Sequence, residues 1–116
     1  MSHKTLLDAA TLRSHLDGAA PPVLIDAGFD LADTGAGERA WAAGHLPGAH
    51  YLHLDHDLSG PKNGRNGRHP LPERTAFARL AGALGIAPGR QVVAYDAQGG
   101  PYAARVWWML RWLGHE

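Results

Sequence analysis

The residues of greatest chemical interest lie in a glycine-rich loop, Asp96–Tyr102. The apolar run Gln91–Tyr95 before this loop predicts a buried strand, and the apolar segment Ala103–Leu113 after it predicts a helix. A loop between a strand and a helix aims its backbone N–H groups at one point, and the positive end of the helix dipole adds to their attraction for anions. The pattern therefore predicts a site for an anion or for a thiolate.

The loop opens with an acid, because Asp96 rather than a nucleophilic cysteine follows the strand, and the chain contains no cysteine at all. A carboxylate at this position has two interpretations. It is either a functional group that contacts a partner domain, or a cap that satisfies free N–H groups of the loop and helix.

A histidine-rich segment, residues 50–56, offers a different chemistry. It is one residue short of the H-x-H-x-D-H motif of metallo-β-lactamase-fold hydrolases. Because alternate residues of a strand share a face, His53 and Asp55 could converge, whereas His50 and His56 point elsewhere. A zinc site needs three or four converging ligands. A metal site is therefore the weaker interpretation, and we expect neither a metal nor another cofactor.

The composition predicts one globular domain. The chain has 116 residues, of which 45% are hydrophobic and 19% charged, with a formal net charge of +0. Zero net charge argues against nucleic-acid binding. The N-terminus has no apolar run of signal length, and the longest apolar stretch, Val106–Leu113, is interrupted by Arg111 and too short to span a bilayer. We therefore expect a soluble, cytoplasmic protein that binds no membrane.

Predicted helices and strands alternate along the chain. Asp8 is placed to cap the first helix. Helices are predicted at Ala9–Leu16, Glu38–Ala43, 71–84 and Ala103–Leu113, and strands at Val23–Ile25, His50–Leu54 and Gln91–Tyr95. Alternating helices and short apolar strands predict an α/β fold with a parallel sheet flanked by helices.

Four motifs, in chain order, resemble one protein family. They are Leu24-Ile25-Asp26-Ala27, Gly44-His45-Leu46-Pro47-Gly48-Ala49, Val92–Asp96 and Tyr102–Arg111. Together they resemble the N-terminal domain of a tandem rhodanese, a thiosulfate or 3-mercaptopyruvate sulfurtransferase, from about Thr5 onward. The resemblance implies a rhodanese-like fold and a chemistry that passes sulfane sulfur through a Cys persulfide to a thiophilic acceptor. It also implies that the persulfide forms on a second domain, whose loop carries Cys where this chain has Asp96.

The resemblance also predicts what residues 1–116 leave out. In the family, one more strand follows the tryptophan-rich helix, and this chain stops at Gly114-His115-Glu116, where that strand would begin. We therefore expect residues 1–116 to be the non-catalytic half of a longer sulfurtransferase. The final strand and the catalytic Cys would lie on a second rhodanese domain or a companion fragment, and this chain alone would be inactive.

Asp55 and His69 are the catalytic candidates that the resemblance implies. In mercaptopyruvate-type members the N-terminal domain supplies an Asp and a His, and a Ser of the second domain completes the set. The carboxylate would orient the imidazole, which would move protons around the thiol and the leaving enolate. The loop between the two residues is long here, so the other interpretation is that His69 is a solvated loop residue and Asp55 a strand-end cap.

The same loop carries positive charge at Lys62, Arg65 and Arg68. Because opposite charges attract at a distance, a small anionic sulfur donor would be drawn to it, which makes Arg65 and Arg68 candidates for substrate binding. A solvated surface loop has the same composition, and this alternative stays open.

The tryptophans of the last predicted helix favour packing over ligand binding. Trp108 and Trp112 are four residues apart on one face, and Trp107 lies on the adjacent strip. We expect them in the core, with one side of the helix available to a second domain. A function of a different class also stays open: a catalytically dead rhodanese module that acts as a binding or scaffold domain.

Overall fold

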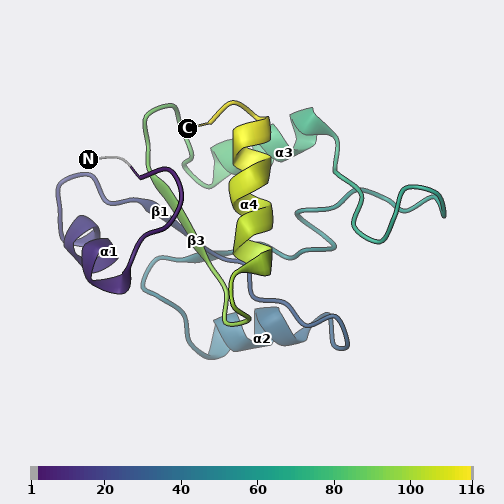
Figure 1. Ribbon diagram of the computed structural model, residues 1–116, viewed down its shortest axis with the longest axis horizontal. Helices are drawn as coiled ribbons and strands as arrows, with labels where there is room; N and C mark the ends of the chain where they lie inside the picture. The colour runs from purple at the N-terminus through teal and green to yellow at the C-terminus, as the bar shows by residue number, and fades with distance from the viewer. Residues whose placement is uncertain (1–2, 116) are drawn as a thin grey trace.

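The structure is a computed structural model that describes residues 3–115. Three parallel strands form its sheet in the order β2-β1-β3, with β1 (Val23–Asp26) in the centre, β2 (His50–Tyr51) on one side and β3 (Val92–Tyr95) on the other. Ile25 is paired with His50 and with Ala94, so the three strands run in register. Figure 1 shows β1 and β3 side by side, with α4 next to β3.

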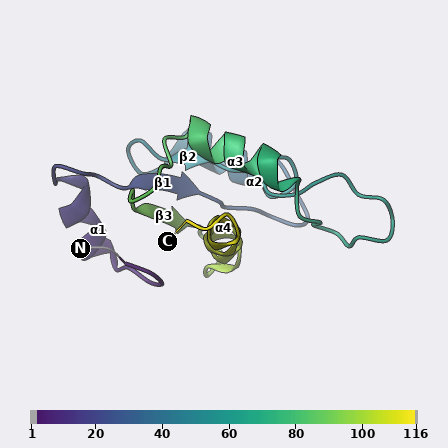
Figure 2. The ribbon, with the colours of Figure 1, turned by 90° about the horizontal axis from the view of Figure 1, so that it is seen from above.

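Helices cover both faces of this sheet. They are α2 (Ala36–Ala43), α3 (Arg74–Ala83) and α4 (Pro101–Trp112), whereas α1 (Ala9–Leu16) lies beside the strands and has no buried residue. Figure 2 shows α2 and α3 on one side of the sheet and α4 on the other. The Asp8 cap is confirmed, because its Oδ1 accepts the backbone N–H of Thr11 at 2.7 Å. The predicted α/β fold with a parallel sheet flanked by helices is confirmed.

The second strand is shorter than predicted. The sequence pattern extends to Leu54, but β2 ends at Tyr51 because the chain turns at His53. The backbone carbonyl of His53 accepts the N–H groups of Asp57 and Leu58 at 2.8 and 3.1 Å, which closes the turn. Alternation of apolar and polar residues continues through this turn, and this explains why the pattern resembles a longer strand.

The core forms between the central strand and the helices. All four residues of β1 are buried, as expected for a central parallel strand. On α4 the buried residues are Val106, Met109 and Leu110, which form one stripe at helical spacing. The expectation that the tryptophans lie in the core is wrong for Trp107 and Trp108, which are 41% and 47% exposed because they fall outside that stripe.

The sheet is incomplete beside β3, which pairs with β1 and with no other strand of the described residues. A groove of about 470 Å³ runs along this open side, between β3, α4 and the N-terminal segment. Val93, Trp107 and Leu110 are among the residues that line it. Part of the N-terminal segment rests there, because Trp107 Nε1 donates to the backbone carbonyl of Lys4 at 2.7 Å. None of the helices at residues 3–115 combines the length and apolarity that crossing a membrane requires.

Candidate active-site elements

The loop between β3 and α4 closes around the carboxylate of Asp96. Its Oδ1 accepts the backbone N–H groups of Gln98 and Gly100 at 2.9 and 2.8 Å. Its Oδ2 accepts those of Tyr102 and Ala103 at 3.0 and 2.9 Å, in the first turn of α4. Gly100, which follows Gly99 in this loop, has a φ of 106°, a conformation that favours glycine.

The electrostatics of Asp96 follow from these contacts. Burial raises the pKa of this carboxyl, but the four backbone N–H donors outweigh burial, and the net pKa lies below its usual value. The predicted anion site therefore exists as a ring of N–H donors, and the chain's own carboxylate fills it. This geometry agrees with the cap interpretation, whereas a contact between Asp96 and a partner domain stays a prediction.

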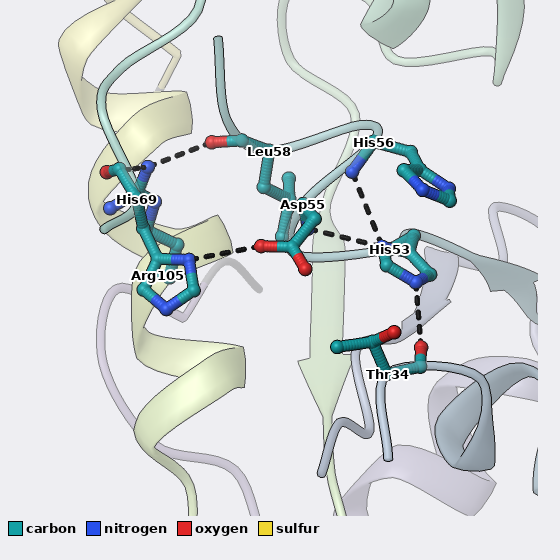
Figure 3. Close-up of polar contacts among 7 residues, drawn as sticks. All are labelled: Thr34, His53, Asp55, His56, Leu58, His69 and Arg105. Carbon is teal, nitrogen blue, oxygen red and sulfur yellow. Dashed lines mark hydrogen bonds and ion pairs between the residues drawn. The ribbon is translucent and has the colours of Figure 1, made fainter. Parts of the chain in front are cut away.

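Asp55 and His69 meet in space although a long loop separates them. His69 Nδ1 lies 3.1 Å from Asp55 Oδ1, and each side chain is 26% exposed (Figure 3). The loop between them closes at its base, where Gly60 N–H donates to the carbonyl of Pro70 at 2.8 Å. A Cβ at position 60 would lie 2.8 Å from the carbonyl oxygen of Leu71, so this close approach of two backbones requires glycine.

His53 supports the backbone of Asp55 and is not free to bind a metal. Its Nδ1 accepts the N–H groups of Asp55 and His56 at 3.1 and 3.2 Å, and its Nε2 donates to the carbonyl of Thr34 at 2.7 Å (Figure 3). The tautomer with hydrogen on Nε2 satisfies all three contacts. No group of three or more His, Asp or Glu side chains in the described part of the chain is arranged to hold a metal ion.

Arg105 joins the two ends of the same loop, a role that was not predicted from the sequence. Its guanidinium donates from one nitrogen, Nη2, to the carbonyl oxygens of Leu58 and His69 at 2.8 and 3.0 Å (Figure 3). Burial lowers the pKa of this side chain. A sequence pattern that could have pointed to Arg105 is its position directly before Val106. A basic residue next to the buried stripe of a helix can place its guanidinium at the edge of the core.

Phe29 packs between the candidate residues. It is 1% exposed, and the edge-to-face distances from its ring centroid to His53 and His69 are 5.3 and 6.4 Å. Tyr102, at the N-terminal turn of α4, packs on the same ring at 5.5 Å. One aromatic side chain therefore links the histidine that supports Asp55, the histidine that pairs with it, and the loop that holds Asp96.

The basic residues of the loop stand apart from this group. Arg65 and Arg68 are exposed, and within residues 3–115 neither side chain makes a hydrogen bond or an ion pair. Figure 1 shows this loop projecting from the body of the molecule. Asn63 and Asn66 shape its tip, since Asn66 Oδ1 accepts the N–H of Asn63 at 3.0 Å. A substrate-binding role for Arg65 and Arg68 stays a prediction.

Asp55 and His69 together can move a proton. With hydrogen on Nδ1 facing the carboxylate, Nε2 of His69 carries the lone pair and is able to accept a proton. A carboxylate beside an imidazole also stabilises the imidazolium that forms. No cysteine occurs in the sequence, so this chain offers no thiolate for the pair to act on.

The fold and these loops define a rhodanese-like domain. Residues 8–116 match the family described as "Rhodanese-like domain", and the chain belongs to this family. A solved structure, the 3-mercaptopyruvate sulfurtransferase from Leishmania major, superposes with a TM-score of 0.85 at 30% identity, over 95% of this chain and 30% of that one. This likeness confirms the rhodanese-like fold.

Sequence relatives point to the same group of sulfurtransferases. This chain is 43% identical over 116 residues to a Pseudomonas aeruginosa protein named "Probable 3-mercaptopyruvate sulfurtransferase", covering 98% of this chain and 40% of that protein. It is 39% identical over 101 residues to rat 3-mercaptopyruvate sulfurtransferase, covering 83% and 32%. It is 33% identical over 97 residues to bovine thiosulfate sulfurtransferase, covering 80% and 31%. The chain thus spans 40% or less of the length of these relatives.

Proposed function

We propose that this chain is the N-terminal, non-catalytic domain of a tandem sulfurtransferase that transfers sulfane sulfur from 3-mercaptopyruvate or thiosulfate to a thiophilic acceptor. The observation that carries the proposal is the Asp55–His69 contact at 3.1 Å in a rhodanese-like domain that has no cysteine. A proton-transfer pair without a nucleophile is useful when a second domain supplies the thiolate. Names of the relatives support the sulfurtransferase class.

Within this proposal each residue has a defined task. Asp55 orients His69, and His69 exchanges protons with the thiol and the leaving group. Arg65 and Arg68 attract the anionic donor to the cleft between the two domains. The persulfide forms on a Cys of the second rhodanese domain or of a companion fragment, and the whole protein works in the cytoplasm.

The second candidate function is a scaffold module without catalysis. One observation favours it: Asp96 already occupies the ring of N–H donors, so this loop is closed to an external anion. In this case the Asp55–His69 contact would be structural only. If the chain contributes to catalysis, removing the His69 imidazole should lower turnover. If it is a scaffold, turnover should not change.

The test is a fusion of this chain to the remaining part of the Pseudomonas relative, assayed with 3-mercaptopyruvate and a thiol and with thiosulfate and cyanide. The fusion should turn over, and His69→Ala should reduce kcat by a factor of about 10² or more, as expected for loss of a general acid–base group. His50→Ala is the matched control, because this histidine is exposed on β2. Turnover that is equal in the wild-type and His69→Ala fusions would support the scaffold function instead.

A further inference from the structure

One guanidinium group holds the two ends of the loop that carries His69. Nη2 of Arg105 contacts the carbonyl oxygen of Leu58, just before the loop, and the carbonyl oxygen of His69 itself. These contacts bridge 47 and 36 residues of sequence, so they are tertiary and not local. Residues 61–68 of this loop are all exposed, and its tip turns at two glycines with positive φ, Gly64 and Gly67.

The helix that carries Arg105 gives this contact a fixed base. Its neighbour Val106 is fully buried, and Met109, one turn further along α4, is buried as well. A side chain that starts from a packed helix can restrain a loop, because its own backbone does not move with the loop. Among residues 3–115 no ion pair joins Arg105 to a carboxylate. The partners of Arg105 are carbonyl groups, so it orders the backbone.

This restraint acts on the residue that must face Asp55. The backbone of His69 is held through its carbonyl by Arg105, and the next residue, Pro70, accepts the N–H of Gly60. With the backbone fixed on both sides, the imidazole has only its side-chain torsions to adjust, and Nδ1 meets Asp55 Oδ1. A pair held in this way loses less conformational entropy when substrate binds.

We propose that Arg105 is a positioning residue for the His69 imidazole, and that it acts through the carbonyl of His69. Its effect on turnover rests on the function proposed above, whereas its effect on His69 does not. The structural part is therefore tested on this chain alone, and the catalytic part on the fusion.

The first experiment is long-range ¹H–¹⁵N NMR of the histidine rings in this chain at pH 8.5, with Arg105→Gln, Arg105→Lys and the control Arg111→Gln. Arg111 lies on the same helix but is exposed, with its guanidinium over the Trp107 ring. We expect one His69 tautomer, protonated on Nδ1, in the wild type and the control. Arg105→Gln should show averaged tautomers, and Arg105→Lys, which keeps a donor, should restore part of the wild-type signal.

Hydrogen exchange of the Gly60 amide provides a second measurement at the base of the loop. Its protection should fall roughly tenfold in Arg105→Gln, as expected for the loss of about one net hydrogen bond. Protection should be unchanged in Arg111→Gln. A folded Arg105→Gln chain with wild-type His69 signals and wild-type Gly60 exchange would overturn the proposal. If Arg105→Gln does not fold, the same comparison is made with Arg105→Met, which also lacks the charged donor, and unchanged His69 and Gly60 signals in that variant overturn the proposal too.

In the fusion, Arg105→Gln should lower kcat more than it raises KM, and Arg105→Lys should recover part of kcat. A fusion with no wild-type turnover would contradict the proposed function but leave the NMR result standing. If the fusion is active but Arg105→Gln changes neither the His69 tautomer nor kcat, the positioning role of Arg105 is refuted and the proposed function is not. The two proposals therefore fail in different ways.

Discussion

Asp96→Asn is the substitution that most directly tests how the loop before α4 is held. The change keeps the size of the side chain but removes its charge and replaces one acceptor oxygen by an NH₂ donor. Two of the four backbone N–H groups that now point at the carboxylate would lose their acceptor and face another donor. The N-terminal end of α4, which is the positive end of the helix dipole, would also lose the negative charge that now lies beside it.

The magnitude follows from the number of contacts. Hydrogen bonds to charged groups contribute about 1.5–3 kcal/mol each in mutational series, and loss of a helix cap costs about 0.5–2 kcal/mol. Because Asp96 is only partly buried, solvent screening reduces these values. Losing two acceptors and the charge should therefore lower the free energy of unfolding by about 2–4 kcal/mol at pH 7.

The stability difference between the wild type and Asp96→Asn should depend on pH. The pKa of Asp96 is lowered in the folded chain, so its carboxylate stabilises the fold above the unfolded-state pKa of about 3.9. This stabilisation is lost as the pH falls through the folded-state pKa. The difference between the wild type and Asp96→Asn should thus be complete at pH 7 and should shrink once the pH falls below about 4.

Urea unfolding followed by tryptophan fluorescence, from pH 7 down to pH 3, measures this difference. Asp30→Asn is the matched control, because its Oδ1 accepts a single N–H, that of Ala32, in an exposed turn. The control should stay within about 0.5 kcal/mol of the wild type. The reasoning is refuted if Asp96→Asn has the stability of the control at pH 7, or if its loss of stability does not change with pH.

Three further predictions concern the chain as a whole. With no cysteine in its sequence, the isolated chain should show no sulfurtransferase turnover, and activity above a heat-denatured control would contradict this. Asp96→Cys should not form a persulfide with thiosulfate, because Pro101 has no N–H to donate to the sulfur; a persulfide detected by mass spectrometry would contradict this. The open edge of β3 beside the apolar groove should recruit a companion fragment or a second copy; a cooperatively melting monomer of 12.4 kDa by light scattering would argue against this. Gly37→Ala should destabilise by about 3 kcal/mol or more in thermal melts, since its Cβ would lie 1.9 Å from the carbonyl oxygen of Gly28, whereas Gly44→Ala, with open space around it, should not.

Local patterns in the sequence were sufficient for most of the secondary structure. The first helix with its Asp8 cap and the loop around Asp96 depend on contacts between residues that are close in sequence, and the central strand is marked by its continuous apolar run. Such contacts leave periodic or positional signals that can be read without the fold. The end of β2 could not be read in this way, because the turn at His53 continues the apolar–polar alternation of the strand.

Only the tertiary structure decided which side chains meet. The contact of Asp55 with His69 spans 14 residues and that of Arg105 with His69 spans 36, and neither spacing has a local signature. The exposure of Trp107 and Trp108 likewise depends on which stripe of α4 faces β3, a choice made by packing of Val106 and Met109. Helices and strands arise from neighbouring residues, whereas a site arises from where the sheet order and the helix packing bring distant loops together.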